Sequence, residues 1–407
     1  MARISRRGMI KSIGVAGTVS LAGCLEGLEG SGADARIGIL QPESGDLGNL
    51  GTPIADGAEL PVLQLEDAGV DFEIESRRED TETEPDVAVD RAQALVDSGY
   101  PTITGAAAST STINAAEDVF FPNEVVGISP ASTSPAITDM DGTYLLRTAP
   151  SDAWQGDAMA EIAVEEEGAD TVSTLFLNND YGQGLNDTFV AGVADRGGEA
   201  LEEVAFEPEQ PSYTAELDTA LADDPDLLMI VGYPESGEVL FRDFYSDFGT
   251  DIPILVPDGL IDDDLPADVD NAMENVMGTA PSARGPGRDD FIGMYEDEFG
   301  RGPSVFNAQA YDATAVLILA SVAAGELDGP TIAGEIRNVA NPGGEVIEPG
   351  NLDEGLDMAA DGEEIQYQGA SGPVEFDDNG DQRAVTYDIG RYDMDGYQVE
   401  RTVEYES

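Results

Sequence analysis

The sequence predicts an α/β protein of two lobes, each with a mainly parallel sheet, and a ligand cleft between the lobes. Short apolar runs alternate along the chain with longer segments of helical periodicity, an order that builds parallel sheets with right-handed crossovers. The chain has 407 residues, more than one hydrophobic core usually supports. The alternation also restarts after residues 147–150, so we expect a second lobe of the same kind.

The first part of the chain contains four predicted strands joined by helices. Residues 36–40 are an apolar run typical of a buried strand, and residues 55–68 carry apolar side chains at helical spacing. In chain order, the predicted elements are a strand at 36–40, a helix at 55–68, a strand at 72–76, a helix at 86–98, a strand at 102–105, a helix ending near residue 121 and a strand at 125–128.

The second part repeats the alternation with elements of similar length. Here too the strands are short apolar runs, and the longer segments between them have helical periodicity. In chain order, the predicted elements are a helix at 154–167, a strand at 171–177, a helix at 185–196, a strand at 204–206, a helix at 214–221, a strand at 227–231, a helix at 235–248 and a strand at 252–256.

The remaining residues predict two helices and a hairpin. A helix at 288–299 is followed by a long apolar helix at 308–324, which we expect to return to the first lobe. Residues 372–376 and 384–392 are predicted to form a β-hairpin around the polar turn 377–381. The acidic residues 393–396 lack the downstream spacing of a calcium-binding loop, so we interpret them as a turn.

These patterns divide the chain between the lobes. Residues 35–148 and 282–380 are predicted to form lobe 1, and residues 149–281 and 381–403 to form lobe 2. The chain then crosses between the lobes several times, and these crossings act as a hinge. Folds of this kind bind small molecules in clefts at the carboxyl ends of their parallel strands.

The first 23 residues have the features of an export signal. Ser5-Arg6-Arg7 opens a basic segment, a short apolar run follows, and Leu21-Ala22-Gly23-Cys24 closes it. The paired arginines are typical of the twin-arginine route, which exports folded proteins. The apolar run is shorter than the ~20 residues that a membrane span needs. The alternative is an ordinary buried N-terminal helix.

The last residues of this segment predict a lipid anchor on the membrane. Leu21-Ala22-Gly23-Cys24 resembles a lipobox, in which the cysteine becomes the new N-terminus and receives lipid. Residues 1–23 are therefore predicted to be a twin-arginine lipoprotein signal peptide, and residues 24–34 a flexible tether. We expect the protein to lie outside the cytoplasm, anchored to the outer face of the cell membrane by lipid on Cys24.

The charge balance excludes some partners and indicates a saline habitat. The chain has 83 acidic and 18 basic residues, for a net charge of −65. The first 23 residues hold four of the basic residues and no acidic ones, so the rest of the chain carries −69. Such a field repels nucleic acid and anionic membrane surfaces. The acid excess and the absence of lysine after residue 23 resemble proteins of extreme halophiles, in which salt screens the repulsion.

The missing residue types exclude most catalytic designs. The chain has no histidine and one cysteine. A Ser-His-Asp triad, a Cys-His pair, an imidazole metal ligand and an internal disulfide are thereby excluded. Carboxylate catalysis, as in glycosidases, and oxygen-ligated Ca²⁺ or Mg²⁺ sites stay open. No pair of acids is marked by the sequence, so we expect no catalytic residue, no cofactor and no metal site.

Two hydroxyl-rich stretches follow predicted strands of the first lobe. Residues 105–112 combine small residues with Ser109 before a helix, where hydroxyls and free N–H groups favour a carboxylate. The alternative is plain capping of that helix. Residues 128–135 place Ser129, Ala131 and Thr133 after another strand, with prolines that fix the turn. Here the alternative is a rigid loop without a ligand.

Two stretches of the second lobe complete the candidate site. Asp258 follows a predicted strand, and its carboxylate is suited to pair with a ligand ammonium. In so acidic a chain, simple surface solvation is the alternative for any single aspartate. Residues 178–184 place Tyr181 at a strand–helix junction. Their Gly-x-Gly lacks the third glycine of a dinucleotide fingerprint, so we reject nucleotide binding there.

Taken together, these motifs resemble those of the extracytoplasmic solute-binding proteins of ABC transporters. The resemblance runs from about residue 36 to the C-terminus and is greatest to the branched-chain amino acid (leucine/isoleucine/valine) binding family, here of haloarchaeal type. It implies the type I periplasmic binding protein fold, with two Rossmann-like lobes, a central ligand cleft and hinge crossings. The residues that carry it are Ser109, Ile128-Ser129-Pro130 with Thr133, Leu146-Arg147-Thr148 before Gln155-Gly156, Asp180-Tyr181-Gly182 before Gly184-Leu185, Gly232-Tyr233-Pro234-Glu235, and Pro257-Asp258-Gly259.

The resemblance implies a role for each candidate residue. The ligand carboxylate is expected on the Ser109 hydroxyl and on the backbone N–H and hydroxyl of Thr133. The ammonium is expected to meet the Ala131 carbonyl and Asp258, with Tyr181 approaching from the second lobe. The residues expected in the pocket wall are Leu50, Trp154 and Tyr233.

The sequence departs from the family pattern at two positions of the second lobe. Gly232 stands where the family has a tyrosine, and Tyr233 follows one residue later. Asp258 stands where the family often has glutamate, which shortens the reach by one methylene. A different zwitterion, or a water between carboxylate and ligand, would fit this shorter side chain.

The function implied is capture of a small amino acid-like solute, with a branched-chain amino acid as the first candidate. Lobe closure would hold the ligand, and a membrane permease with its ATPase would receive it. We expect a monomer. The alternatives are a binding protein for urea or short amides, a sensor of the same fold and, less favoured, a lipid-anchored hydrolase that uses carboxylates.

Overall fold

The computed structural model describes residues 34–249 and 251–406, which belong to one compact unit. The predicted signal peptide, Cys24 and residues 24–33 of the predicted tether lie outside the described residues.

Five parallel strands form the first sheet, in the order β2-β1-β3-β4-β5. Side chains of β1 such as Ile37, Ile39 and Leu40 are fully buried, as expected for a parallel strand covered on both faces. We refer to this sheet and the helices packed on it as the first lobe. Its strands are β1 (Ala35–Gln41), β2 (Ile74–Asp80), β3 (Thr102–Gly105), β4 (Val126–Ser129) and β5 (Leu145–Arg147).

Helices from distant parts of the sequence cover this sheet. The apolar helix α12 packs against α2, β1 and β3, so it returns to the first lobe as predicted. The helices of this lobe near the N-terminus are α2 (Gly48–Ala68), α3 (Pro85–Asp97), α4 (Ser109–Ala115) and α5 (Phe121–Asn123), with a π-helical stretch Ala116–Phe120 between the last two. The later ones are α11 (Arg288–Phe299), α12 (Asn307–Ala324), α13 (Gly329–Ala340) and α14 (Leu352–Asp361), with a two-stranded parallel sheet of β11 (Glu345–Ile347) and β12 (Ile365–Tyr367).

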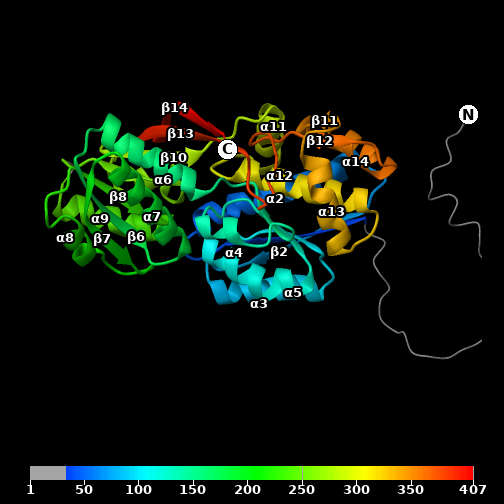
Figure 1. The fold of residues 1–407 in the computed structure, drawn as a ribbon, viewed down its shortest axis with the longest axis horizontal. Coiled ribbons are helices and arrows are strands. Elements are labelled where there is room, and N and C mark those ends of the chain that lie inside the picture. Colours follow the sequence, from blue (N-terminus) through cyan, green and yellow to red (C-terminus); the bar gives the residue numbers. More distant parts are fainter. Residues whose placement is uncertain (1–33, 250, 407) are drawn as a thin grey trace, which may run out of the picture. The chain divides into compact units, whose positions relative to one another are not determined.

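Seven strands form the second sheet, in the order β14-β13-β10-β9-β8-β6-β7. The first five strands along the chain are parallel, and β13 runs antiparallel to both β10 and β14. Strands β13 and β14 are the red strands of Figure 1. We refer to this sheet and its helices as the second lobe. Its strands are β6 (Thr171–Leu177), β7 (Glu199–Phe206), β8 (Leu227–Val231), β9 (Ile254–Val256), β10 (Val276–Pro281), β13 (Ala384–Asp393) and β14 (Gly396–Glu406). Its helices are α6 (Asp152–Glu161), α7 (Asp180–Asp195), α8 (Thr214–Ala220), α9 (Pro234–Asp247) and α10 (Leu265–Val269).

The two lobes repeat one strand order. In the first lobe the second strand along the chain lies outside the first, and the third lies on its other side. The parallel strands of the second lobe do the same, in the order β7-β6-β8-β9-β10. Each sheet therefore has a point where successive connections diverge, between β1 and β3 and between β6 and β8. Ligands of open α/β sheets bind outside the strand ends at such points.

Several elements agree with the sequence predictions to the residue. The strands predicted at 102–105, 171–177 and 227–231 and the helix predicted at 288–299 are confirmed as β3, β6, β8 and α11. The turn predicted at 393–396 is also confirmed, because it joins β13 to β14. Helix α2 begins at Gly48, before the predicted residue 55, because Pro53 is accommodated inside the helix. The residue boundaries of the lobes remain a prediction.

The predicted C-terminal hairpin is wrong in its pairing. Residues 372–376 form no named strand and make only isolated bridges, at Pro373 and Phe376. The strand predicted at 384–392 exists as β13, but its hairpin partner is β14. Residues 396–406 alternate Tyr397, Val399, Val403 and Tyr405 with polar residues, a strand pattern that the prediction overlooked, and the turn 393–396 pairs this strand with β13.

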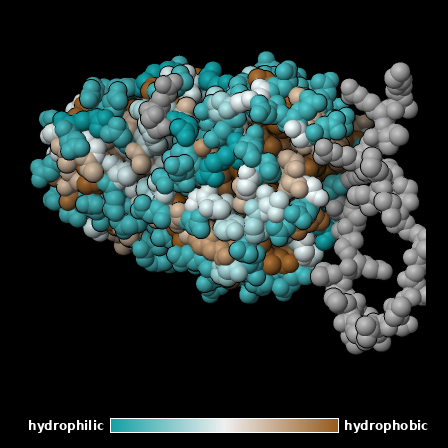
Figure 2. Space-filling model, turned by 45° about the vertical axis from the view of Figure 1, so that its right-hand side comes forward, coloured by the Kyte–Doolittle hydropathy of each residue, from teal (hydrophilic) through white to brown (hydrophobic). Residues whose placement is uncertain are grey.

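The surface of the described residues is largely polar. The face shown in Figure 2 is mostly hydrophilic, and the exposed large apolar side chains of the described residues are Val346, Met394 and Val399. Within residues 34–249 and 251–406 no single helix is long and apolar enough to cross a membrane, although α12 and α13 pass such a test as a pair bent by 115°.

Candidate functional site

A small cavity lies where the diverging points of the two sheets meet. Its volume is about 20 Å³, room for about one water molecule. It takes residues from the loops after β1, β3 and β4 of the first lobe, and after β6, β8 and β9 of the second. The lining residues are Leu47, Leu50, Ile54, Ala107, Ser109, Ala131, Tyr181, Tyr233, Asp258, Gly259 and Phe306.

Ser109 reaches this cavity because the chain turns sharply after β3. Gly105 has a φ of 148°, and a Cβ there would lie 2.2 Å from the carbonyl oxygen of Leu40, so only glycine fits. The small residues that follow bring Ser109 to the start of α4, where its side chain is buried. The Ser109 Oγ accepts a hydrogen bond of 3.2 Å from the backbone N–H of Ser134, which ties the two hydroxyl-rich loops together.

Most hydroxyls of these two loops hold the backbone in place. The carbonyl oxygen of Ala106 accepts hydrogen bonds from Ser129 Oγ at 2.6 Å, Thr112 Oγ1 at 3.0 Å and Ser132 Oγ at 3.1 Å. All three side chains are buried. These hydroxyls therefore stabilise the loops themselves, as a rigid loop would require. The two loops in turn fix the backbone positions of Ser109 and Ala131.

Arg147 also stabilises the second of these loops. Its side chain is fully buried and its guanidinium donates to the carbonyl oxygen of Ser134 at 2.9 Å. The guanidinium also pairs with Asp381 at 2.6 Å, between Nε and Oδ1. Breaking a buried pair leaves an uncompensated charge, which is strongly destabilising. The loop that carries Ala131 and Thr133 is therefore rigid.

Thr133 belongs to the same loop but faces a second buried acid. Its Oγ1 donates to Asp152 Oδ2 at 2.9 Å, and its carbonyl oxygen accepts from the Asp152 N–H at 2.8 Å. Burial, together with the nearby charge of Asp258, raises the pKa of Asp152 well above its ordinary value. Thr133 is not among the residues that line the small cavity.

Two stacked tyrosines form the opposite wall. The rings of Tyr181 and Tyr233 are nearly parallel, at 5°, with centroids 5.5 Å apart. The Tyr181 hydroxyl donates to Asp258 Oδ2 at 3.4 Å and accepts from the Gly259 N–H at 3.2 Å. Tyr181 comes from the first turn of α7 and Tyr233 from the residue before α9. Although Gly232 stands where the family has a tyrosine, the next residue, Tyr233, thus places an aromatic ring in the cavity wall.

Asp258 is the charged group of the cavity. It follows β9 and is 3% exposed, and its Oδ1 has no hydrogen-bond partner among the described residues. Burial raises the pKa of Asp258 to about 7, and hydrogen bonds from neighbours, Tyr181 among them, oppose the rise only in part. An isolated buried carboxylate is costly unless it gains a partner. The cavity is therefore suited to a cationic group next to Asp258.

Of the three predicted wall residues, Leu50 and Tyr233 line the cavity and Trp154 does not. Trp154 lies on α6, half-buried, with its ring edge against Tyr405 at a centroid distance of 6.0 Å. Sequence reasoning missed Phe306, which lines the cavity just before α12 with a φ of 66°. Such a backbone conformation is strained for a bulky residue and often marks a functional position. No local sequence signal identifies it.

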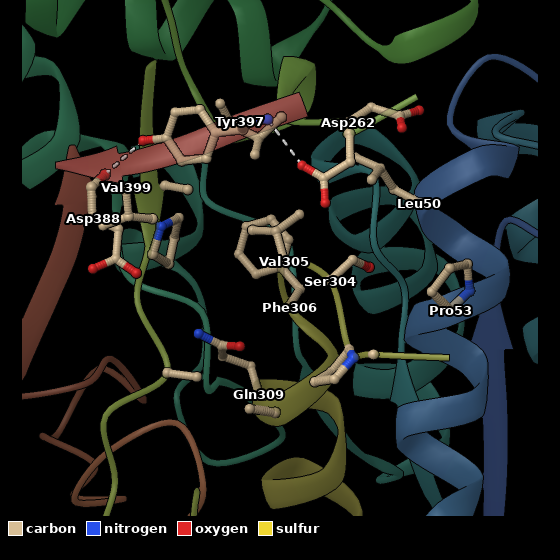
Figure 3. Close-up of a pocket in the computed structure, with 18 of the residues that line it drawn as sticks. Leu50, Pro53, Asp262, Ser304, Val305, Phe306, Gln309, Asp388, Tyr397 and Val399 are labelled. Carbon is tan, nitrogen blue, oxygen red and sulfur yellow. Dashed lines mark hydrogen bonds between the residues drawn. The ribbon is translucent and has the colours of Figure 1, made fainter. Parts of the chain in front are cut away.

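Phe306 and Leu50 separate the small cavity from a larger one of about 400 Å³. Figure 3 shows Leu50 and Pro53 on α2 and Tyr397 and Val399 on β14, with Phe306 between them. The larger cavity thus lies between the lobes next to the candidate site. Within the part of the chain that the structure describes, no cluster of three acidic or sulfur side chains could hold a metal ion.

Comparison with known proteins gives one consistent family. A model described as "Periplasmic binding protein" matches residues 34–397. The chain is 29% identical to the chemotactic signal transduction substrate-binding protein BasB of Halobacterium salinarum, over 85% of this chain and 84% of that protein. It is 24% identical to the leucine-, isoleucine-, valine-, threonine- and alanine-binding protein of Pseudomonas aeruginosa, over 74% of this chain and 82% of that protein.

Among solved structures, the leucine-binding protein LivK of Thermotoga maritima has the same fold. The TM-score is 0.77 at 26% identity, and the match covers 91% of this chain and 98% of that chain. The repeated strand order, the cavity between the two sheets and a family match over residues 34–397 agree, and the chain belongs to the periplasmic binding protein family.

Proposed function

We propose that this protein captures a small zwitterionic amino acid between its lobes and delivers it to an ABC permease and its ATPase. The observation that carries this proposal is the small cavity lined by Ser109, Ala131 and Asp258. The Ser109 hydroxyl can donate to a ligand carboxylate, and the Ala131 carbonyl and the Asp258 carboxylate can accept from a ligand ammonium. A branched-chain amino acid is the first candidate, because relatives from Pseudomonas aeruginosa and Thermotoga maritima are named for leucine.

The ligand ammonium belongs beside Asp258 in this proposal. The acceptors for it are the carbonyl of Ala131 and the Oδ1 of Asp258, which has no hydrogen-bond partner among the described residues. A charge-assisted hydrogen bond there would compensate the burial of the carboxylate. The ligand carboxylate belongs with the Ser109 hydroxyl and, because the Thr133 hydroxyl already donates to Asp152, with the backbone N–H of Thr133. The apolar faces of Leu50, Ile54 and Phe306 suit an alkyl side chain.

Binding requires the lobes to separate and close again. A cavity of about 20 Å³ has no room for an amino acid, so we infer that the ligand enters an open form. Because Ser109 and Asp258 belong to different lobes, a bound ligand bridges them. It then stabilises the closed form by its greater affinity for that form.

Calorimetric titration in concentrated KCl tests the ligand class. Leucine, isoleucine and valine should bind, whereas urea and short amides, which do not need Asp258, should not. Asp258→Ala and Ser109→Ala should each weaken leucine binding at least tenfold, which is about 1.4 kcal/mol. Asp187→Ala is the matched control, because Asp187 is exposed on α7 and its carboxylate only accepts from Gln183. Wild-type affinity in both site variants would contradict the assignment.

Chemotactic sensing is a second candidate function. BasB of Halobacterium salinarum, which covers most of this chain, is named for a chemotactic signal transduction system. A deletion strain separates the two roles. Loss of radiolabelled leucine uptake would favour transport, and loss of migration toward leucine with normal uptake would favour sensing.

We also propose that Cys24 anchors the protein by lipid after twin-arginine export. The basis is the sequence Leu21-Ala22-Gly23-Cys24 and the pair Arg6-Arg7. Cys24→Ser should release the protein into the medium with unchanged leucine affinity. Replacing Arg6 and Arg7 by lysine should instead retain the protein in the cytoplasm.

A further inference from the structure

We propose that Asp46 is a latch between the lobes, which holds the cleft closed by capping helix α9 from the opposite lobe. The inference rests on lobe closure as proposed above, and it adds a residue that does not line the candidate ligand cavity. Asp46 lies in the loop between β1 and α2 of the first lobe. Helix α9 belongs to the second lobe.

The contact is buried and has three hydrogen bonds. Asp46 Oδ1 accepts from the backbone N–H and from the Oγ of Ser236, both at 2.7 Å. The Asp46 carbonyl oxygen accepts from the Glu235 N–H at 3.4 Å. Asp46 is 3% exposed, although it lies in a loop of a highly acidic chain.

Helix α9 has no cap of its own. The first N–H groups of a helix lack partners within it and are usually satisfied by a preceding side chain. Tyr233, the residue before α9, makes no such hydrogen bond, Pro234 has no N–H, and the Gly237 N–H bonds to the Tyr233 carbonyl. The N–H groups of Glu235 and Ser236 remain, and Asp46 accepts from both. A carboxylate is also the charge that a helix N-terminus favours.

The same contact completes the candidate ligand cavity. Leu47, next to Asp46, and Tyr233, next to α9, both line the small cavity. When Asp46 caps α9, these two wall residues are brought to one another from opposite lobes. Asp46 and Tyr233 also line a larger cavity of about 530 Å³, so the latch lies between that cavity and the ligand cavity.

A second contact of this kind lies beside the first. Helix α7 also starts at the cleft, and the N–H of its first residue, Asp180, donates to Thr110 Oγ1 of the first lobe at 3.1 Å. In this case the helix also has its own cap, because Asn179 Oδ1 accepts from Gly182. When the cleft opens, α7 therefore keeps a cap, whereas α9 loses its cap. The Asp46 contact thus favours the closed form more than the Thr110 contact does.

The latch is weak enough to open. Burial raises the pKa of Asp46 to about 6, with smaller contributions from the charges of Glu209 and Glu235, while the hydrogen bonds from Ser236 lower it. Asp46 Oδ2 has no hydrogen-bond partner among the described residues. The cost of burying this carboxylate offsets part of the free energy that the three hydrogen bonds contribute to the closed form, so the lobes can separate.

The test compares Asp46→Ala, Asp46→Asn and Ser236→Ala with the wild type in concentrated KCl. Hydrogen exchange of the segment 232–240, read by mass spectrometry without added amino acid and with saturating L-leucine, reports the capped N–H groups. Stopped-flow dissociation of leucine reports closure. Asp187→Ala is the control, because it removes an exposed acid of the second lobe whose carboxylate accepts from Gln183 and takes no part in the latch.

We expect Asp46→Ala to speed exchange of 232–240 and to release leucine about tenfold faster, with little change in the association rate. Asp46→Asn keeps an acceptor and should fall between Asp46→Ala and the wild type. Ser236→Ala removes one donor and should have a smaller effect of the same sign, even if Asp46→Ala folds poorly. Asp187→Ala should behave as the wild type.

Equal exchange of 232–240 in the wild type and in both the Asp46→Ala and Ser236→Ala variants would overturn the latch. The exchange measurement without leucine decides this even if leucine is not the ligand. Failure of the proposed function has a different signature, in which leucine changes neither heat nor exchange in the wild type.

Discussion

Two buried aspartates in this chain have opposite surroundings. Asp312 is fully buried, and all four of its hydrogen bonds are donated to it, by the Tyr367 hydroxyl, the Ala370 N–H and the N–H and hydroxyl of Ser371. Asp258 accepts a hydrogen bond of 3.4 Å from the Tyr181 hydroxyl, and its Oδ1 has no hydrogen-bond partner among the described residues. A carboxylate with every lone pair in use stabilises its own loop. One with an oxygen unused is suited to an external partner, which is how we distinguish a structural acid from a ligand-binding one.

This contrast predicts opposite effects of the same substitution. Asp258→Asn should raise the free energy of unfolding by about 2 kcal/mol at pH 8, because it removes a buried charge with few partners. Asp312→Asn should lower it, because an amide NH₂ would face groups that can only donate or that already donate to Asp312. Chemical denaturation of the two variants and the wild type in concentrated KCl measures both. Destabilisation by Asp258→Asn at pH 8 would contradict our view of that site.

The same residue predicts a pH dependence of stability. The pKa of Asp258 is about 7 in the folded protein, against about 4 in an unfolded chain. Between these values the folded protein binds more protons than the unfolded one, so the free energy of unfolding rises as the pH falls from about 7 toward 4. Comparing wild type with Asp258→Asn measures this contribution together with the change at Asp152, whose pKa the charge of Asp258 raises. Identical pH profiles of the two proteins would show that Asp258 does not titrate in this range.

At the scale of elements, the first lobe depends on a close approach of two helices. A Cβ at Gly57 of α2 would lie 2.5 Å from the carbonyl oxygen of Asn307, at the start of α12. The residue before Asn307 is Phe306, which lines the candidate cavity. The glycine therefore serves the cavity, because it lets α12 begin where Phe306 lines its wall.

Gly57→Ala should lower the free energy of unfolding by about 2 kcal/mol, because neither backbone can move without loss of packing. It should also weaken leucine binding through the displacement of Phe306. Gly334→Ala is the control. Gly334 lies exposed inside α13 with nothing within 4 Å of an added Cβ, so alanine there should stabilise by about 1 kcal/mol. Thermal unfolding of both variants gives the comparison, and equal melting temperatures would refute it.

For the whole molecule, the family indicates where the protein works, and the net charge indicates the salt concentration that it needs. The protein belongs to the periplasmic binding protein family, which implies a place of work outside the cytoplasm, and its relatives are solute-binding proteins. Its net charge of −65 is spread over a mostly hydrophilic surface. Such a charge opposes the compact state unless salt screens it.

Dilution of salt should therefore unfold the protein. The Debye length grows from ~3 Å at 1 M to ~10 Å at 0.1 M salt, so repulsion among the acids reaches further as salt is removed. We expect the melting temperature to fall steeply between 3 M and 0.1 M KCl, with NaCl restoring it as well as KCl does. Circular dichroism follows the transition, and a constant melting temperature across this range would contradict screening as the cause.

Much of the fold is predictable from local patterns. Strand β8 is a continuous apolar run, and β3 and β6 combine apolar residues with threonines, which also favour strands. Their boundaries follow from these local patterns. The candidate site is partly predictable for the same reason. Ser109 and Asp258 both follow strands, and the carboxyl ends of parallel strands meet at one edge. Their role in binding stays a prediction.

The sequence by itself determined the α/β alternation, the two lobes and the loops that face the cleft, because each depends on periodicity over a few residues. Tertiary structure alone decided that Trp154 packs on Tyr405 and that Phe306 completes the cavity. It also decided that Asp46, one acid among 83, caps a helix of the opposite lobe. Such contacts join residues far apart along the chain, and which surfaces meet is set by the packing of whole lobes rather than by any local pattern.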